Sequence, residues 1–523
     1  MDFISERLLT LILFSPLVGA VAVMLVPADQ KRTVRWIALL ASLIPLGLSI
    51  ALWFSYNASA GGFQFEEKET WYAAINATYH LGVDGISVPM ILLTTILVPL
   101  GILTSFSIEE RVKAFMALFL MLETGMLGVF LSLDLILFFL FWEIGLVPMY
   151  FMISLWGSEK GEREIGGRKV PARTYASFKF MIYTVAGSLG LLLAIQIIGL
   201  AAGTFDMLEL FKVWPSFNQQ ILANVSIDTV KNVAFWAFVI AFVIKVPVWP
   251  FHTWLPDAHT EAPTAGSMML AGVMLKLGAY GLLRLVLPLF PEQAQAAAPL
   301  IAFFAMLAIV LGAFAAYGQK DFKRLVAYSS VNHMGFVVLG IAVVAWSYGS
   351  RSDAAQLSAT IAGSGAVLQM FNHGLSAAAM FFLVGVVYER THTRDLDELG
   401  GGIWQLAPVY GGILIFSSMA SLGLPGLNGF VSEFAIVRGS WPVFTVLTAI
   451  SMLGLLFTGA YILKGIQKVL HGPRNEKWAD HGMEIKPREV IVMAPLMILM
   501  LLIGVWPWWL MNVINETVKR LIA

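Results

Sequence analysis

The sequence predicts an all-α polytopic membrane protein with about fourteen transmembrane helices, on the basis of its composition, segment lengths and periodicity. Of the 523 residues, 58% are hydrophobic and 13% are charged, whereas a soluble domain carries roughly 25% charged residues. Too few charges remain to cover the surface of a water-soluble protein of this size. About fourteen segments contain the roughly 20 mostly apolar residues that a transmembrane helix needs. The strands of a β-barrel would be shorter and would alternate apolar and polar residues.

The predicted spans fall into four consecutive regions. Residues 1–110 hold the N-terminal helices, 111–290 a first group of five helices, 291–472 a second group of five, and 473–523 a cytoplasmic loop and the last transmembrane helix. The start of the chain is mixed in charge and has no small-residue cleavage site, so the first segment is expected to be a retained span. In chain order, the spans are centred near Pro16, Leu46, Leu97, Gly125, Gly145, Gly190, Val243, Leu275, Ala308, Val337, Met370, Met419, Leu455 and Met500.

The basic residues of the connections predict the orientation of the chain, because Lys and Arg accumulate in cytoplasmic loops. Of the 33 Lys and Arg residues, 21 lie in the odd-numbered connections, Lys323 among them. Nine, including Arg284, lie in the other connections or at the termini, so both termini are expected on the outer side. The stretch Phe251–Pro263 contains no Lys or Arg, and its assignment to the cytoplasmic side rests on the even number of spans.

Net charge and cysteine content exclude several classes of function. The 33 basic and 33 acidic residues sum to zero, which argues against a nucleic-acid partner because such a partner requires a basic surface. The chain has no Cys, which excludes disulfides, thiolate zinc sites and Cys-ligated iron–sulfur clusters. It also lacks a Walker-type loop and a dinucleotide-binding Gly-x-Gly-x-x-Gly motif. We therefore expect no cofactor in this chain and an energy source in partner subunits.

Two of the predicted spans contain helix-breaking residues beside an ionisable side chain. Lys245 lies in the proline-containing stretch 242–250, where a helix break is expected near 245–250, and Glu433 follows a break expected near 423–429, which contains a proline and glycines. Proline removes a backbone donor, and free backbone groups at membrane depth are tolerated where they line a cavity or are buried in protein. Paired interruptions in the two halves of a chain indicate the ion site of a transporter; the alternative is a packing kink.

A weak internal repeat accompanies these interruptions. Ser132-Leu-Asp134 opens one span and Gln319-Lys-Asp321 opens another, each two spans before a broken helix. The repeat then contains five spans, and an odd number of spans requires the two copies to have inverted topology. The predicted architecture is therefore two inverted five-helix repeats, each with a broken helix.

Ionisable residues inside the predicted spans are the candidate functional residues. Each charge at mid-bilayer costs roughly 2.5–3.5 kcal/mol on insertion scales, so stability alone does not explain them. Desolvated Lys and Glu, like His, change protonation near neutral pH, which suits proton transfer; the alternative is ion pairs that fix helix register. Lys179, near a span end, is expected to snorkel to the cytoplasmic surface, and Asn332 and Asn372 to orient the following imidazoles by hydrogen bonding. The other ionisable residues are Glu123, Glu143, Lys245, Lys276, His333, His373 and Glu433.

Four motifs are similar to those of one protein family. The longest runs from Trp249 to Pro263 and reads Trp-Pro-Phe-His-Thr-Trp-Leu-Pro-Asp-Ala-His-Thr-Glu-Ala-Pro, and Ser267 follows it. The others are Ser329–Gly335, Phe371–Leu375 and Leu424–Phe434. The chain resembles the proton-translocating antiporter-like subunits of respiratory complex I and of multisubunit cation/proton antiporters, and the resemblance extends from about Asp84 to Leu470.

The resemblance implies a path for protons. This path would include Glu143, Lys245, Lys276, His333, His373 and Glu433. The first two would form the coupling pair, the third would be the central relay, the histidines would continue the path, and the last would be the terminal proton site. Glu123 matches an additional acid near the input half. His252 and His259 are either entrance residues or structural residues at the cytoplasmic end.

The resemblance also implies a setting and partners. The chain would be a multi-pass subunit of the bacterial inner membrane, in the membrane arm of an NADH-quinone oxidoreductase, and redox chemistry in partner subunits would drive it. Glu433 stands where the sister subunits typically have lysine, and the chain stops at Ala523, just after its last span, whereas the largest sister subunit continues into a lateral helix. Expected partners are neighbouring antiporter-like subunits, a lateral helix from one of them, the lipid bilayer and protons. The alternatives are a subunit of a multisubunit sodium/proton antiporter and a non-pumping scaffold.

Overall fold

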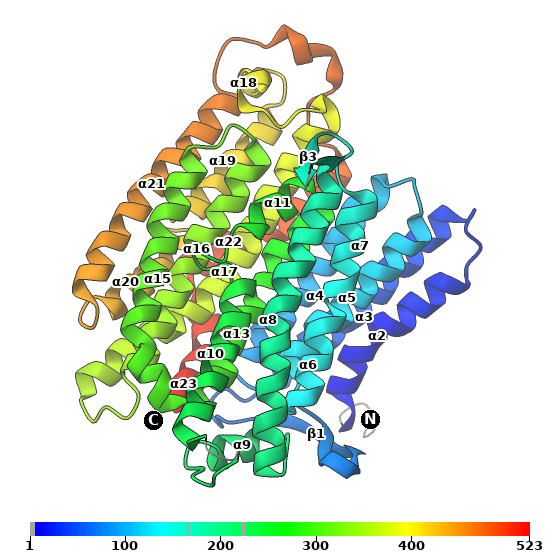
Figure 1. Ribbon diagram of the computed structural model, residues 1–523. Helices are drawn as coiled ribbons and strands as arrows, with labels where there is room; N and C mark the ends of the chain where they lie inside the picture. The colour runs from blue at the N-terminus through cyan, green and yellow to red at the C-terminus, as the bar shows by residue number, and fades with distance from the viewer. Residues whose placement is uncertain (1–5, 166, 222–224, 523) are drawn as a thin grey trace.

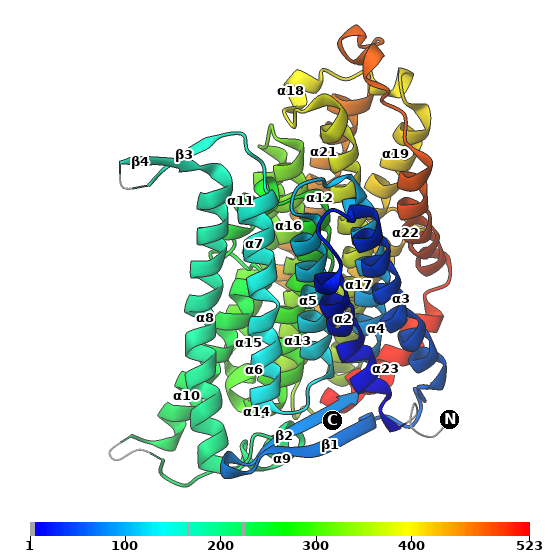
Figure 2. The same ribbon diagram turned by 90° about the vertical axis from the view of Figure 1, so that its right-hand side faces the viewer.

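A computed structural model of the chain describes residues 6–165, 167–221 and 225–522. Within these ranges, thirteen helical segments are long and apolar enough to cross a membrane. The shorter apolar helix α19 (Pro408–Leu422) and α20 (Asn428–Ser440) together form one further, interrupted span, in agreement with the expected number of about fourteen. The spans stand side by side in one bundle (Figures 1 and 2). Both chain ends lie on one face, called here the terminal face, and α18 (Leu396–Leu399) lies on the opposite, loop face.

Three spans precede the repeats and carry a β-hairpin that the sequence did not predict. The spans are α2 (Leu8–Leu25), α3 (Lys31–Ser55) and α4 (Ser87–Thr104). Between α3 and α4, β1 (Gln64–Tyr72) pairs antiparallel with β2 (Ala77–Val83), and the hairpin lies along the terminal face (Figure 2).

A charged cluster attaches the hairpin to the helices. His80 Nδ1 lies 2.7 Å from Asp206 Oδ2, and Lys68 Nζ lies 2.8 Å from the same oxygen. Burial raises the pKa of the Asp206 carboxyl, but the bonds from His80 and Lys68 outweigh it and hold this pKa well below its usual range. Asp206 is therefore ionised at neutral pH and keeps β1 and β2 close to the helix that it caps.

The first group of five spans contains more irregular helix than the sequence indicated. Three connecting elements accompany it: β3 (Glu162–Ile165), β4 (Arg168–Pro171) and α9 (Met207–Val213). Its fifth span contains π-helical turns at Leu270–Met274 and Leu282–Val286. The helices are α5 (Val112–Leu131), α6 (Leu135–Ile144) with α7 (Leu146–Trp156), α8 (Ala172–Ala202), α10 (Ile227–Lys245) with α11 (Trp254–Glu261), and α12 (Thr264–Met269) with α13 (Leu275–Gly281) and α14 (Leu287–Leu289).

The second group of five spans precedes the C-terminal helices. Its members are α15 (Pro291–Tyr317), α16 (Phe322–Trp346), α17 (Asp353–Thr391), the pair α19 and α20, and α21 (Thr445–Leu470). The last span is α22 (Pro487–Val505). Short 3-10 turns lie at 73–75, 105–107, 403–405 and 476–481.

Matching backbone bridges relate the two groups by inversion. Asp134 and Asp206 form an antiparallel bridge, and each caps the helix that it precedes. Asp321 and Asp395 repeat this bridge and both caps in the second group. The first bridge lies beside α9 on the terminal face and the second beside α18 on the loop face (Figures 1 and 2). The weak sequence repeat at Asp134 and Asp321 therefore corresponds to an inverted structural repeat.

The assignment of Phe251–Pro263 to a cytoplasmic connection is wrong for most of this stretch. Residues 254–261 form α11, and every residue of this helix is buried. Burial is tolerable because its carboxylates are paired: Asp257 contacts Lys179 Nζ at 2.7 Å and Arg324 Nη1 at 3.3 Å. Lys179 therefore does not snorkel freely but anchors the second half of the broken helix.

A further helix, α23 (Trp508–Ile522), follows the last span and was not predicted from the sequence. This helix is amphipathic and crosses the terminal face below α17 (Figure 1). The ring of Trp509 lies 5.2 Å from that of Trp53 and 6.4 Å from that of Phe371, which connects α23 to α3 and α17.

Candidate functional site

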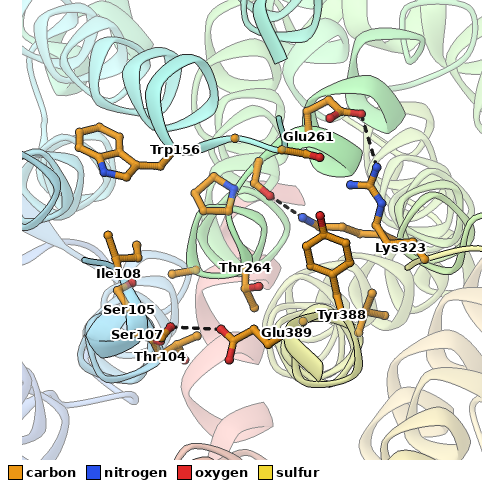
Figure 3. Close-up of a pocket in the computed structure, with 18 residues that line it drawn as sticks. Thr104, Ser105, Ser107, Ile108, Trp156, Glu261, Thr264, Lys323, Tyr388 and Glu389 are labelled. Carbon is orange, nitrogen blue, oxygen red and sulfur yellow. Dashed lines mark hydrogen bonds and ion pairs between the residues drawn. The ribbon is translucent and has the colours of Figure 1, made fainter. Parts of the chain in front are cut away.

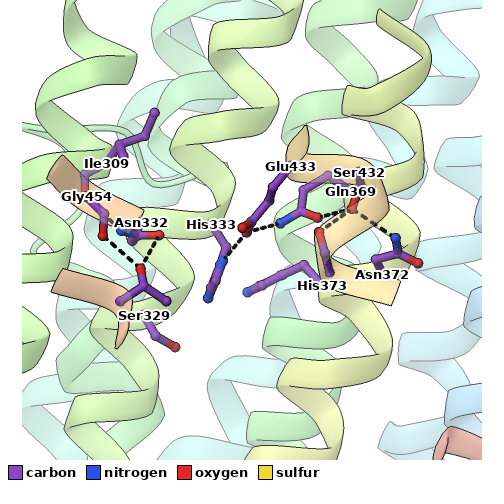
Figure 4. Close-up of polar contacts among 12 residues, drawn as sticks. Ile309, Ser329, Asn332, His333, Gln369, Asn372, His373, Ser432, Glu433 and Gly454 are labelled. Carbon is purple, nitrogen blue, oxygen red and sulfur yellow. Dashed lines mark hydrogen bonds and ion pairs between the residues drawn. The ribbon is translucent and has the colours of Figure 1, made fainter. Parts of the chain in front are cut away.

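Four buried side chains from four helices form a row inside the bundle. Lys276 Nζ, on α13, lies 2.7 Å from His373 Nδ1, on α17. The ring of His373 lies 5.6 Å from that of His333, on α16. His333 Nδ1 lies 2.7 Å from Glu433 Oε1, on α20 (Figure 4). All four residues are 4% exposed or less, so the row is shielded from bulk water.

Lys276 reaches this row because its helix is locally distorted and closely packed. Its Nζ also donates to the Ala271 carbonyl, which belongs to the π-helical turn before α13. A Cβ atom at Gly374 would lie 2.8 Å from the Gly272 carbonyl oxygen, so glycine at this position allows α17 to approach the turn. The close approach brings His373 within hydrogen-bonding distance of Lys276.

A second set of polar groups fixes Glu433 at the other end of the row (Figure 4). Gln369 Nε2 donates to Glu433 Oε1 at 3.0 Å, and Ser432 Oγ donates to Gln369 Oε1 at 2.5 Å. The Tyr461 hydroxyl lies 3.3 Å from the other nitrogen of His333. The helix break leaves room for the acid, because a Cβ at Gly423 would lie 3.2 Å from Glu433 Oε2.

The expectation that two asparagines orient the imidazoles is wrong. Asn332 Nδ2 donates to the Ile309 carbonyl at 2.9 Å, and Asn372 Nδ2 donates to the Asn428 carbonyl at 2.7 Å. Consecutive residues of a helix do not face the same neighbour, so an asparagine cannot point along the same direction as the histidine that follows it. These amides tie α16 to α15 and α17 to α20.

The other three candidates lie outside the row. Lys245 ends α10, and its Nζ lies 4.7 Å from the ring centre of Trp142. Glu143, the next residue on α6, acts on Lys245 through space, although its buried Oε1 has no hydrogen-bond partner among the described residues. Glu123 on α5 is fully buried, and neither of its carboxylate oxygens has a partner in the described chain.

A cavity of about 270 Å³ lies where α7, α16 and α17 meet the loop face (Figure 3). Glu261, Lys323 and Glu389 are among its lining residues. Lys323 is buried and donates to the Ala262 carbonyl. The sequence placed Lys323 in a connection, but Asp321 caps α16 and therefore puts Lys323 in the first turn of that helix.

His259, on α11, is influenced by charges on both sides, one at the cavity and one in the row. It is fully buried, stacks on Phe381 at 4.3 Å, and has no hydrogen-bond partner on either ring nitrogen within the described ranges. Lys323, on the cavity side, and Lys276, in the row, both act on it electrostatically. His252 lies apart, with its ring 6.2 Å from that of Tyr328. In the part of the chain that the structure describes, no group of three or more His, Asp or Glu side chains is arranged to hold a metal ion.

Comparisons with known proteins agree with this architecture. Residues 132–458 match the family model described as NADH:quinone oxidoreductase/Mrp antiporter, TM, and residues 17–133 match the amino terminus of NADH-ubiquinone oxidoreductase chain 4. NADH-quinone oxidoreductase subunit M of Rhodobacter capsulatus is 38% identical over 99% of this chain and 96% of its own length.

Two solved structures have a similar fold. A chain of respiratory complex I from Thermus thermophilus has a TM-score of 0.83 at 26% identity, over 98% of this chain and 100% of its own. A chain of the Mrp complex from Dietzia has a TM-score of 0.82 at 18% identity, over 99% of this chain and 98% of its own; this likeness concerns the fold alone. The chain therefore belongs to the NADH:quinone oxidoreductase/Mrp antiporter family, in the branch of membrane subunits named NADH-quinone oxidoreductase subunit M.

Proposed function

We propose that this chain translocates protons through the row of Lys276, His373, His333 and Glu433, as a membrane-arm subunit of an NADH-quinone oxidoreductase. The observation that carries the proposal is the row itself. Each member can both accept and release a proton, and two of the three contacts are hydrogen bonds of 2.7 Å. A purely structural ion pair needs no such chemistry.

The hydrogen bonds of the row indicate which nitrogen or oxygen atoms would carry a proton at rest. A charged Lys276 donates to the Ala271 carbonyl and to His373 Nδ1, which leaves His373 neutral with its hydrogen on Nε2. His333 donates from Nδ1 to the Glu433 carboxylate. A proton that leaves Lys276 therefore passes to His373, crosses between the two rings by way of water or ring rotation, and reaches Glu433 through His333.

The basic residues and the cavity at Lys323 together support one direction of proton transfer. The excess of Lys and Arg on the loop face favours a cytoplasmic position for this face, and both termini would then lie on the outer side. The cavity at Lys323 would then take up protons from the cytoplasm, and His259 would pass them towards Lys276. The Glu143 carboxylate would stabilise the protonated form of Lys245. If these two side chains moved apart, Lys245 would release its proton, and this release would couple the first half of the chain to the neighbouring subunits.

The energy for transfer would come from partner subunits. Moving one charge against 100 mV costs about 2.3 kcal/mol, and the row contains only groups that exchange protons. We infer that redox chemistry elsewhere in the complex drives the exchange through neighbouring membrane-arm subunits and a lateral helix from one of them. The chain itself would contribute no redox centre.

NADH-driven proton uptake into proteoliposomes that contain the whole complex tests the proposal. Glu143→Gln and Lys245→Ala should each lower the number of protons moved per NADH oxidised. Glu162→Gln and Lys169→Ala are matched controls on the exposed β3–β4 hairpin and should leave the ratio unchanged. Normal ratios in both buried-site variants would contradict the proposal.

A sodium/proton antiporter subunit is the second candidate, because the fold is also that of the Mrp complex chain. Co-purification of the chain with a peripheral arm that carries iron–sulfur clusters would exclude it. Proton movement that requires Na⁺ and proceeds without NADH oxidation would support it against the first proposal.

A further inference from the structure

Arg284 is a buried charge that the proton row does not use. The sequence placed it in a connection on the terminal side, but it lies in the fifth span of the first repeat and is 2% exposed. Lys276, Tyr280 and Arg284 follow one another at intervals of four residues, so they share one face of the helix. Arg284 therefore lies about two turns from Lys276 towards the terminal face.

The partner of Arg284 is an equally buried carboxylate. Arg284 Nη2 forms an ion pair with Asp84 Oδ2, and Asp84 is 2% exposed. Asp84 Oδ1 accepts hydrogen bonds from the backbone N–H groups of Ile86 and Ser87, at 3.0 and 3.1 Å, at the start of α4. The pair therefore joins the fifth span of the first repeat to α4, and its carboxylate is held by a charge and two further donors.

Aromatic rings fill the space around the guanidinium. Its carbon lies 4.7 Å from the ring centre of Phe63 and 5.6 Å from that of Tyr280. Tyr280 is itself buried, and its hydroxyl donates to the Phe130 carbonyl at 3.2 Å. This hydroxyl is thus engaged with the backbone on the stretch between Lys276 and the ion pair.

The C-terminal helix α23 covers the pair from the terminal face. The backbone N–H of Gly85 donates to Thr517 Oγ1 of α23 at 2.9 Å. A Cβ atom at Gly85 would lie 2.0 Å from the Val513 carbonyl oxygen, so α23 lies directly against the backbone next to Asp84. Glycine at position 85 is required for this contact.

The chemistry of the pair is opposite to that of the row. A guanidinium remains protonated in proteins and accepts no hydrogen bond, so it cannot take up a proton and pass it on. Asp84 cannot accept a proton without losing its pairing with Arg284. On the other side of Lys276, the imidazoles of both histidines and the carboxyl of Glu433 are groups that can bind and release a proton. From Lys276, one direction thus leads to groups that relay protons and the other to a pair that does not.

We propose that the Asp84–Arg284 pair is a proton stop, which prevents protons on Lys276 from leaking to the terminal face along their own helix and so directs them to Glu433. This inference rests on the proposed function, because it takes Lys276 as a proton carrier. In this proposal Arg284 keeps protons on the path to Glu433 but does not itself bind or pass on a proton.

The proposed proton stop is tested by measuring the passive flux of protons through the whole complex while no NADH is oxidised. Proteoliposomes receive a pH step in the absence of NADH, and a fluorescent dye follows the decay of the gradient. Arg284→His replaces the fixed cation with a group that titrates, and should accelerate the decay severalfold. Arg284→Lys keeps the charge, and because lysine can lose its proton, its decay should accelerate only at alkaline pH. Both rates are compared at equal amounts of assembled complex.

A double variant identifies the route of the leak. Adding Lys276→Met to Arg284→His should return the decay to the wild-type rate. Wild-type decay in both single Arg284 variants would overturn the stop, and so would a leak that persists in the double variant. Failure of the proposed function is a separate outcome, since it appears as normal NADH-driven pumping in the Lys276→Met and Glu433→Gln single variants.

Discussion

The Glu433→Gln variant tests whether the charge of Glu433 serves proton transport or the stability of the fold. The substitution keeps the size of the side chain and removes its charge, while Glu433 Oε1 accepts bonds from His333 and Gln369. A hydrogen bond to a charged group contributes about 1.5–3 kcal/mol and a neutral one about 0.5–1.5 kcal/mol, so weakening two bonds costs about 2 kcal/mol. Removing the buried charge recovers roughly 2.5–3.5 kcal/mol on insertion scales. We therefore expect the free energy of unfolding to change by about 1 kcal/mol or less.

The functional effect should be much larger than the structural one. A glutamine neither binds nor releases a proton, so the row ends at His333 and the protons moved per NADH should fall. The assay is NADH-driven acidification of proteoliposomes, with assembly and thermal stability measured on the same preparation. The reasoning is refuted if the variant pumps normally, or if it loses pumping only because the complex fails to assemble.

A matched control lies at the loop face. Glu489 Oε2 pairs with Arg390 Nη2 at 2.7 Å, and both side chains are buried. Arg390 also donates to the carbonyls of Val386, Gly482 and Glu484, as expected of a structural anchor. Removing one partner of a buried pair costs about 3–5 kcal/mol, so Glu489→Gln should destabilise the chain while the assembled fraction pumps at the normal ratio.

Three further predictions concern single elements of the structure. Lys276→Met should stop pumping without loss of assembly, and Lys169→Met should change neither, as measured by proton-to-NADH ratios. Gly374→Val should destabilise the chain by about 1–3 kcal/mol, because its side chain would meet the Gly272 carbonyl, and thermal unfolding of the complex checks this. The pKa of Asp206 is lowered in the folded chain, so its contribution to stability is present above the ordinary carboxyl pKa of about 3.9 and is lost as the pH falls through the lowered value. The protection of the amides of residues 64–83 against hydrogen exchange, relative to an unstructured chain at the same pH, should therefore be high at neutral pH and fall in strong acid; protection that does not change with pH would contradict this.

The spans and both helix breaks could be predicted from local sequence because their causes are local. About twenty apolar residues define a span wherever it packs, and proline removes a donor from any helix. The breaks accordingly fall at 246–253 and 423–427, close to the predicted 245–250 and 423–429. The β1–β2 hairpin escaped notice because its exposed strand has no apolar alternation, and it depends on bonds to Asp206, far along the chain.

The wrong assignments of α11, Arg284 and Lys323 share a different physical cause. Each involves a charged side chain whose partner is distant in sequence. Lys179 and Arg324 neutralise Asp257, which allows α11 to be buried where a loop was expected. Arg284 and Lys323 were assigned to connections because each lies near the end of a predicted span of about twenty residues, where hydropathy does not fix the boundary. Ion pairing with Asp84 and a bond to a backbone carbonyl reverse that assignment.

The candidate site was predicted residue by residue but not in its connectivity. Sequence position cannot state that Lys276 bonds to His373 and His333 to Glu433, because these contacts depend on π-helical turns and close glycine packing. Nor could it state that Lys245 lies against the ring of Trp142, next to Glu143 in the chain. The roles of these residues in transport stay predictions.

An experimental density map of the assembled complex, at a resolution that shows ordered water, tests the central claim most directly. We predict water between the rings of His333 and His373, which form the one contact in the row that is not a hydrogen bond, so that protons can cross this gap. Apolar side chains that fill the gap, with no water in it, would contradict proton transfer along this row and favour a scaffold.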